Sequence, residues 1–211
     1  MKIVKSSYKI EDKINGNEIL ERIERAGRTC YKSEKEITAY SAKKFVKMLF
    51  ETGHESVLEH EKITVRVTCD RGLSHEIVRH RIASYSQEST RYCNYSKSKF
   101  GNEIVLIQPA FWNSKSTEDK EKLDLWKKSM DLAEKVYMRL IALGATPQEA
   151  RSVLPNSLKT EIVMTMNLRE WRHFFKLRTS YSAHPQMREL FRPMLNEFKK
   201  QIPVVFDDIT Y

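Results

Sequence analysis

The strongest constraint on the fold is a stretch in which apolar and polar residues alternate, between positions 62 and 70. Its apolar positions are Ile63, Val65, Val67 and Cys69. Successive side chains of a β-strand point to opposite faces, so this stretch predicts a strand with one buried and one polar face. Such a strand needs a second layer against its apolar face, which the rest of the chain must provide.

Helical repeats of apolar residues supply that layer. The longest predicted helix spans 117–143, where Trp126, Met130, Ala133, Tyr137 and Leu140 recur at steps of three and four. Other helices are predicted at 17–27, 38–52, 73–81, 147–154, 168–178 and 185–201, and other strands at 103–109 and 160–167. Few strands alternate irregularly with many helices, which indicates an α/β or α+β fold. The length of 211 residues suggests one domain covering 1–211.

Composition narrows the class of protein. Lys and Arg number 37 and Asp and Glu 28, so the net charge is +9, which attracts nucleotides, nucleic acids or acidic membranes without choosing among them. The three cysteines lie far apart without a C-x-x-C pair, which argues against a zinc finger and for a reducing, cytoplasmic location. No stretch approaches the roughly 20 apolar residues that span a bilayer, and MKIVKSSYKI lacks the apolar core of a signal peptide.

Two familiar site patterns are absent from the sequence. In GHESVLEH, His54 and His60 are six residues apart, about 240° around an α-helix, so they cannot share a face as in zinc hydrolases. No metal site is therefore predicted. No G-x-G-x-x-G follows a predicted strand, so the chain lacks a Rossmann dinucleotide motif, and a bound nucleotide must be held by side chains.

The segment RHRIASYSQESTRY, from Arg79 to Tyr92, is too polar for a core. If the preceding helix extends to position 81, Glu76 lies one turn from Arg79 and His80, and a solvated charge run with an internal ion pair is the simplest interpretation. The crowded hydroxyl, amide and guanidinium groups that follow suit a loop wrapped around a phosphate and a base edge.

The predicted helix 168–178 presents two faces. Trp171, Phe174 and Phe175 form an apolar stripe that Arg178 continues. An inward guanidinium needs an anion or carbonyl partner, unless it extends to solvent at the helix end. A second face carries Arg169, His173 and Leu177.

These residues resemble a known family. Arg79-His80-Arg81, seven residues and then Ser89 match the R-H-R-x7-S signature of flavin-dependent thymidylate synthases. GHESVLEH, SYSQESTRY, EARSVLP and the N-x-R…L-R spacing of positions 167–178 follow in the family's order, so the resemblance covers roughly 53–178.

The resemblance implies a fold with a few-stranded, mainly antiparallel sheet packed with helices, and a homotetramer with active sites at subunit interfaces. It implies that FAD contacts Ser56, Glu59, Arg79, His80, Arg81, Ile82, Asn167, Arg169, His173 and Leu177. It implies that dUMP contacts Glu76, Arg79, Gln87, Ser89, Arg91, Arg151 and Arg178. His54 and Tyr92 match positions near the nicotinamide or folate site.

The implied reaction is the reductive methylation of dUMP to dTMP, in which methylenetetrahydrofolate supplies the carbon, and FAD, reduced by NADPH, supplies the hydride. Arg178, Ser89 and His54 are the catalytic candidates. Arg178 suits the charge that develops on a uracil carbonyl. Ser89 is interpreted as a substrate ligand, because no histidine follows it nearby to activate it as a nucleophile.

Two alternatives remain open at the level of sequence. The first is a nucleic-acid-binding protein that uses the positive charge and the loop rich in Tyr and Arg, although RNP, KH and zinc-module patterns are absent. The second is a flavoprotein of the same scaffold with another nucleotide substrate. The polar set at Gln87, Ser89, Arg91 and Arg178 argues against the second.

Overall fold

The computed structural model describes residues 1–112 and 116–211. Residues 1–7, 67–79 and 86–162 form one compact unit, and residues 8–66, 80–85 and 163–211 form another. We call them unit 1 and unit 2. The single domain expected over 1–211 stays a prediction.

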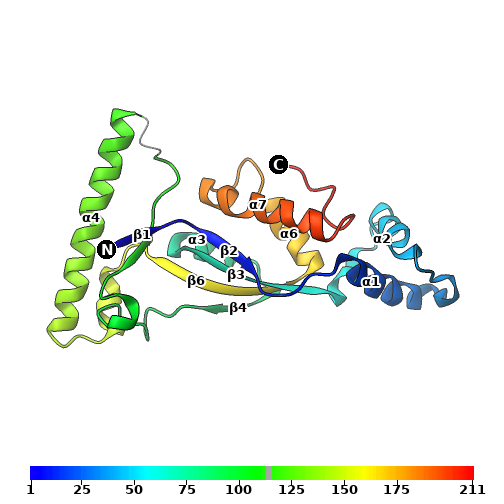
Figure 1. The fold of residues 1–211 in the computed structure, drawn as a ribbon, viewed down its shortest axis with the longest axis horizontal. Coiled ribbons are helices and arrows are strands. Elements are labelled where there is room, and N and C mark those ends of the chain that lie inside the picture. The colour runs from blue at the N-terminus through cyan, green and yellow to red at the C-terminus, as the bar shows by residue number, and fades with distance from the viewer. Residues whose placement is uncertain (113–115) are drawn as a thin grey trace. The chain divides into compact units, whose positions relative to one another are not determined.

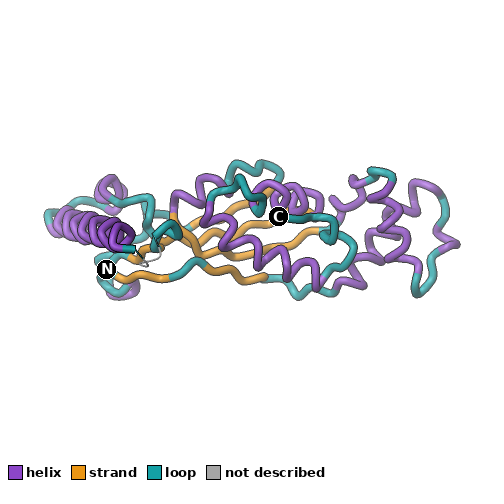
Figure 2. The backbone as a smooth tube through the Cα atoms, turned by 90° about the horizontal axis from the view of Figure 1, so that it is seen from above, coloured by secondary structure: helices purple, strands orange, loops and turns teal. Residues whose placement is uncertain are grey.

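The fold mixes helices with a small sheet. The strands are β1 (Lys2–Val4), β2 (Ser7–Ile10), β3 (Lys62–Asp70), β4 (Ala83–Gln87), β5 (Val105–Ile107) and β6 (Lys159–Asn167). The helices are α1 (Gly16–Tyr31), α2 (Ser41–Glu51), α3 (Arg71–Ile77), α4 (Thr117–Ala142), α5 (Pro147–Ala150), α6 (Leu168–Arg178) and α7 (Pro185–Gln201), with 3-10 turns η1 (Glu34–Glu36), η2 (Glu55–His60), η3 (Ser98–Phe100) and η4 (Arg151–Val153). The sheet has the order β2-β3-β6-β4, and β1 pairs with β5 in parallel. Figure 2 shows the strands in orange and the helices in purple.

Strands β3 and β6 run antiparallel. The Leu168 N–H donates to the Glu61 carbonyl at 2.9 Å, and the Arg71 N–H donates to the Leu158 carbonyl at 3.0 Å. The start of β3 therefore lies beside the end of β6, and the end of β3 beside the start of β6. The alternation predicted for β3 is confirmed, because Ile63, Val65, Val67 and Cys69 are all buried. The expected mixed fold with a small antiparallel sheet and helices is confirmed.

The core of unit 1 forms around α4. Trp126, Met130 and Tyr137 are buried on one side of this helix and join a cluster that includes Ile104 and Leu158. The predicted apolar stripe is therefore confirmed. The helix starts where predicted, since the Ser116 hydroxyl accepts the Asp119 N–H at 3.0 Å. Gly144, at a φ of 93°, follows its end in the left-handed region.

The core of unit 2 is aromatic. Figure 1 shows α6 and α7 lying together, and Trp171, Phe174 and Phe175 of α6 are fully buried. Trp171 lies 5.2 Å from Phe198 of α7, measured between ring centroids. Its indole N–H donates to the Ile63 carbonyl at 3.0 Å, which ties α6 to β3. The apolar stripe predicted for 168–178 is confirmed, and so are both ends of this helix and of α7.

The predicted helix 73–81 is wrong at its C-terminal end. Helix α3 stops at Ile77, and its C-cap is Val78, so Arg79, His80 and Arg81 lie beyond it. The predicted loop after them is also partly wrong, because Ala83–Gln87 forms β4. An edge strand tolerates a polar sequence, since alternate side chains of β4 are exposed.

Other parts of the chain also differ from expectation. Strands β1 and β2 had no predicted counterpart, because three or four residues are too few to show a clear alternation. Of the three cysteines, Cys30 is exposed and Cys69 is buried. Residues 55–60 form a 3-10 helix, whereas the angle between His54 and His60 was calculated for an α-helix. Six residues of a 3-10 helix make two turns and span about 12 Å along the axis. None of the described helices combines the length and apolar character that crossing a bilayer requires.

Candidate functional site

Helix α6 is fixed at its first turn. It follows β6 without an intervening loop, and Asn167 is both the last strand residue and the N-cap. The Asn167 side-chain oxygen accepts the Glu170 N–H at 2.8 Å. The carboxylate of Glu170, however, bonds to His80 instead of completing a capping box. The angular position of every α6 side chain is therefore set by the sheet.

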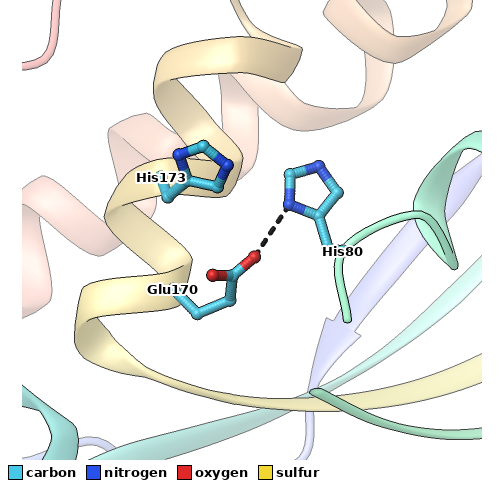
Figure 3. Close-up of side chains that lie close together, drawn as sticks. All are labelled: His80, Glu170 and His173. Atoms are coloured by element: carbon cyan, nitrogen blue, oxygen red, sulfur yellow. Dashed lines mark hydrogen bonds and ion pairs between the residues drawn. The ribbon is translucent and has the colours of Figure 1, made fainter. Parts of the chain in front are cut away.

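Glu170, His80 and Arg178 form a continuous line of hydrogen bonds. His80 Nδ1 lies 2.9 Å from Oε1 of Glu170 (Figure 3), and Nε of Arg178 donates to Nε2 of His80 at 3.0 Å. The side chains of His80 and Glu170 are 3% and 9% exposed, so water competes little for these bonds. The inward-facing Arg178 predicted from the sequence is half-buried, and it meets an imidazole backed by a carboxylate.

The hydrogen bonds define the protonation of His80. A guanidinium N–H can only donate, so Nε2 of His80 accepts and the ring proton resides on Nδ1, facing the carboxylate of Glu170. Burial lowers the pKa of His80 below its usual value. Arg178 and His173 push the pKa in the same direction, while Glu170 opposes them. The ring is therefore neutral at pH 7 in one tautomer.

Glu170, His80 and His173 also bring potential metal ligands together. One ligand atom from each lies within 4.8 Å of the others, and Figure 3 shows both histidine rings on the same side of the Glu170 carboxylate. The hydrogen bond between Nδ1 of His80 and Oε1 of Glu170 already engages two of these ligand atoms. The positive charge of Arg178, which donates to Nε2 of His80, also disfavours a second cation. The expectation of no metal stays a prediction.

A pocket of about 410 Å³ opens beside this line of hydrogen bonds, within the range of small-molecule sites. Residues predicted to bind flavin make up part of its lining: Glu59, Ile82, Asn167, Arg169 and His173. Residues that the sequence reasoning did not assign to it complete the lining: Glu55, Glu170, Arg172 and Lys176. Ser56 is exposed on η2, Leu177 is exposed on α6 and Arg81 is exposed beside Ile82, and none of the three lines the pocket.

The charges at the pocket fit an anionic ligand with hydrogen-bonding groups. Arg169 Nη1 lies 2.6 Å from Oε1 of Glu59, and both side chains are about half exposed, so this ion pair opens at little cost. Lys176 is also half exposed, 3.7 Å from Asp208. Two exchangeable cations, the Asn167 amide and the His173 imidazole match the diphosphate and hydroxyl groups of a dinucleotide such as FAD.

Arg172 is a pocket residue that sequence reasoning missed. It is buried, and it donates to both carboxylate oxygens of Asp208 at 2.6 and 2.8 Å and to the carbonyl of Val205. Its guanidinium carbon lies 4.4 Å from the ring centroid of Phe50. Its position between two inward residues of α6, Trp171 and Phe174, could have indicated that Arg172 is buried. Its partners could not be predicted, because they lie in a segment with no periodic pattern.

Several residues predicted to bind dUMP lie in unit 1. Gln87, on β4, donates through its amide to the hydroxyls of Ser74 at 2.9 Å and Thr160 at 3.2 Å, which orients the side chain. The Ser89 hydroxyl accepts the Arg91 N–H at 3.3 Å, and this bond fixes the turn that follows β4. Glu76 is half-buried in the last turn of α3.

The guanidinium groups of Arg79, Arg91 and Arg151 are exposed. Within 1–112 and 116–211, these groups have no carboxylate within salt-bridge distance. Cations without an acidic partner are suited to a phosphate, and the assignment of the three arginines to dUMP stays a prediction. The structure does not show contacts among the three.

The remaining predicted residues lie at the surface. His54 is exposed, and its Nδ1 lies 2.8 Å from the hydroxyl of Tyr31, a residue at the end of α1 that the sequence did not indicate. Tyr92 is 75% exposed, with the Arg91 guanidinium carbon 5.4 Å from its ring centroid. Both side chains are accessible to a second ligand.

Comparison with known proteins adds a family to this geometry. Residues 14–204 match the family described as thymidylate synthase complementing protein. A flavin-dependent thymidylate synthase of Pyrococcus abyssi is 38% identical over 150 residues, which are 71% of this chain and 59% of that protein. One of Geobacter sulfurreducens is 35% identical over 190 residues, covering 87% of this chain and 78% of that protein. The chain thus spans less than two thirds of the length of the Pyrococcus relative.

A solved structure shares the fold. The crystal structure of a UMP/dUMP methylase PolB from Streptomyces cacaoi bound with 5-Br dUMP superposes with a TM-score of 0.80, covering 98% of this chain and 96% of that one at 22% identity. The signature residues, the pocket lined by five other residues that the resemblance implies, and the match over nearly the whole chain agree. The chain belongs to the thymidylate synthase complementing protein family.

Proposed function

We propose that this chain is a flavin-dependent thymidylate synthase, which converts dUMP to dTMP by reductive methylation. The observation that carries the proposal is that five residues expected to bind flavin line one pocket, with His80 of the signature hydrogen-bonded beside it. The names of the relatives from Pyrococcus abyssi and Geobacter sulfurreducens support the same reaction.

The pocket supports FAD as the cofactor, which when bound supplies the hydride chemistry that no side chain can provide. We assign Arg169 and Lys176 to its phosphates and Asn167 and His173 to its hydroxyl groups. Ile82, which is 67% exposed, offers an apolar surface to a ring. These residues bind and orient the flavin, and Glu170 keeps its charge engaged with His80.

The substrate proposed is dUMP. The guanidinium groups of Arg79, Arg91 and Arg151, which have no acidic partner among the described residues, suit its dianionic phosphate. Gln87 and Ser89 suit polar groups of the nucleotide. Arg178 is assigned to a uracil carbonyl, where a fixed cation stabilises the negative charge that develops during methylation. Glu76 completes the set as an acceptor for an N–H or hydroxyl.

NADPH and methylenetetrahydrofolate are proposed as the reductant and the carbon donor. His54 and Tyr92 are accessible side chains for their contacts. We propose a cytoplasmic location, in keeping with three cysteines that all have free thiols.

We further propose that the chain works as a homotetramer. Leu125, Leu132, Val136 and Leu143 are exposed along α4 and its C-cap. Steps of seven, four and seven residues keep them within about 40° of one another around the helix. The spacing is self-complementary, because an antiparallel copy would pair the first with the last and the middle two with each other. Such a stripe suits a two-fold contact, one of the interfaces that a tetramer needs.

The test is the release of tritium from dUMP labelled at uracil C5, with FAD, NADPH and methylenetetrahydrofolate present. The proposal expects release that depends on every component and yields dTMP. Absence of release above background from folded protein contradicts it. The colour of the purified protein separates the nucleic-acid-binding alternative, which predicts colourless protein with oligonucleotide binding that falls steeply with salt.

A further inference from the structure

Glu170 is a buried carboxylate whose role goes beyond capping α6. The backbone N–H of Glu170 already serves the cap by donating to Asn167. Its carboxylate is 9% exposed and lies against the ring of His80. Burying a carboxylate is costly unless a donor compensates, so a position with no role beyond helix formation would favour an uncharged residue.

His80 is held on several sides, so its ring can fix the position of a side chain that bonds to it. Its carbonyl accepts the Tyr85 hydroxyl at 2.7 Å, which fixes its backbone. Phe174 and His173 pack against the ring, with centroids at 4.7 and 5.5 Å. The remaining freedom is the location of the ring proton, and the carboxylate of Glu170 determines it.

The ring proton decides whether His80 can accept a hydrogen bond from Arg178. With the proton on Nδ1, Nε2 accepts from Nε of Arg178. In the other tautomer, two N–H groups would face each other, and one would lose its hydrogen bond in a half-buried site. A protonated ring would in addition place a second positive charge beside the guanidinium.

We propose that Glu170 is a positioning residue, which fixes the tautomer of His80 and thereby holds the guanidinium of Arg178 in place for its contact with the substrate. This inference rests on the proposed function, in which Arg178 meets a uracil carbonyl. Neither the signature nor the predicted contacts include Glu170, and its effect is exerted through His80.

The first measurement reads the tautomer directly. Nitrogen-15 NMR of the full chain labelled at histidine distinguishes Nδ1–H from Nε2–H, and loss of a signal in His80→Gln identifies the residue. The wild type and Glu170→Gln, which retains an acceptor oxygen, are expected to show Nδ1–H. Glu170→Ala is expected to show a mixture of tautomers. This readout needs neither flavin nor turnover.

The second measurement uses steady-state kinetics with dUMP. We expect Glu170→Ala to lower kcat by about 10- to 100-fold, as for other residues that orient a catalytic group, with a smaller change in KM. Glu170→Gln should recover most of kcat. The acidic limb of the pH profile should move to lower pH in Glu170→Ala, because the carboxylate that raises the pKa of His80 is gone and the ring is harder to protonate.

Glu24→Ala is the matched control. Glu24 is 1% exposed, and it pairs with Arg28 at 3.0 Å, so its loss removes a buried carboxylate from the same unit. It should destabilise the protein while leaving the His80 signals and the pH profile unchanged.

The outcomes separate the two proposals. If Glu170→Ala keeps the Nδ1–H form, or keeps kcat and the pH profile of the wild type, the positioning role is contradicted. If Glu24→Ala alters His80 and kcat as strongly, the effect is a general loss of packing and the positioning role is again contradicted. If the wild type releases no tritium from dUMP, the proposed function fails, while the tautomer measurement still decides whether Glu170 controls His80.

Discussion

The guanidinium of Arg172 is held by the carboxylate of Asp208 through two hydrogen bonds, 2.6 Å from Nη1 to Oδ1 and 2.8 Å from Nη2 to Oδ2. The pair joins α6 to the segment that follows α7. The Arg172 guanidinium lowers the pKa of Asp208, although partial burial works against this shift. Arg172 is 3% exposed and Asp208 55% exposed, so the arginine depends on the bond more than the carboxylate does.

Arg172→Ala is expected to destabilise the protein by about 2 to 3 kcal/mol, because it removes charge-assisted hydrogen bonds and leaves the Val205 carbonyl without its donor. Urea unfolding followed by tryptophan fluorescence measures the change. Lys176→Ala is the control, since Lys176 is 49% exposed and 3.7 Å from Asp208, and it should cost less than about 1 kcal/mol. Equal losses in the two variants would show that the buried pair contributes nothing special.

The stability of the protein is expected to fall as the pH drops below about 6.5, in part through His80. Its pKa is lowered in the folded state, so the unfolded chain takes up the proton first, and folding is favoured fully only above the unfolded value. His80→Gln removes this titration. The difference in unfolding free energy between the two proteins, measured from pH 5 to 8, should therefore depend on pH only below about 6.5. A difference that stays constant over the whole range would contradict a lowered pKa.

Arg169→Gln is expected to weaken FAD binding by about tenfold or more, since it removes the charge-assisted hydrogen bond that we propose to a flavin phosphate. Its ion pair with Glu59 is exposed, so the free energy of unfolding should change by less than about 1 kcal/mol. Fluorescence titration of the apoprotein with FAD measures affinity. Arg25→Gln, an exposed arginine on α1, should leave FAD affinity unchanged, and a similar loss there would point to a general effect of net charge.

Arg178→Lys is expected to lower kcat with dUMP by about 100-fold or more. Lysine keeps the charge but lacks the planar guanidinium that bonds to His80 and that, in the proposed function, also reaches a substrate oxygen. Steady-state kinetics at saturating FAD test this. Arg188→Lys changes a guanidinium that lies over Tyr181 at 5.2 Å and should leave kcat close to the wild-type value. An active Arg178→Lys enzyme would remove Arg178 from the catalytic set.

Leu132→Glu is expected to reduce the assembled mass of the protein without unfolding it. Leu132 is 62% exposed in the protomer, so a charge there costs folding little but opposes burial against a second α4. Light scattering after gel filtration measures the mass. Lys127→Glu, on the opposite side of α4, is the control for added negative charge. An unchanged mass for Leu132→Glu would exclude the stripe as an interface.

Regular elements with a clear period were predictable from the sequence. The alternation in β3 and the aromatic stripe of α6 each fix which face of the element is buried. A shift by one residue would expose the whole apolar set. In the structure, Ser116 and Asn167 cap the first turns of α4 and α6, since short polar side chains satisfy the first free N–H groups.

The sequence singled out candidate residues but not their arrangement. The signature indicated His80 and the stripe of helix 168–178 indicated Arg178, but no local pattern shows that residues 98 positions apart share a hydrogen bond. Arg172 and Glu170 were missed as pocket residues for the same reason, because their partners Asp208 and His80 come from segments without periodicity. Similarly, α3 ends at Ile77, and the helical pattern carried the prediction four residues too far.

Strand β6 passes directly into α6 at Asn167, so no linker residue can adjust the rotation of the helix relative to the sheet. Inserting a single residue at this junction would turn the whole helix by about 100° and carry Arg178 away from His80. A chimera between family members should therefore exchange the strand and helix together as one cassette. Splicing the helix alone would change its phase, and no point substitution downstream would restore it.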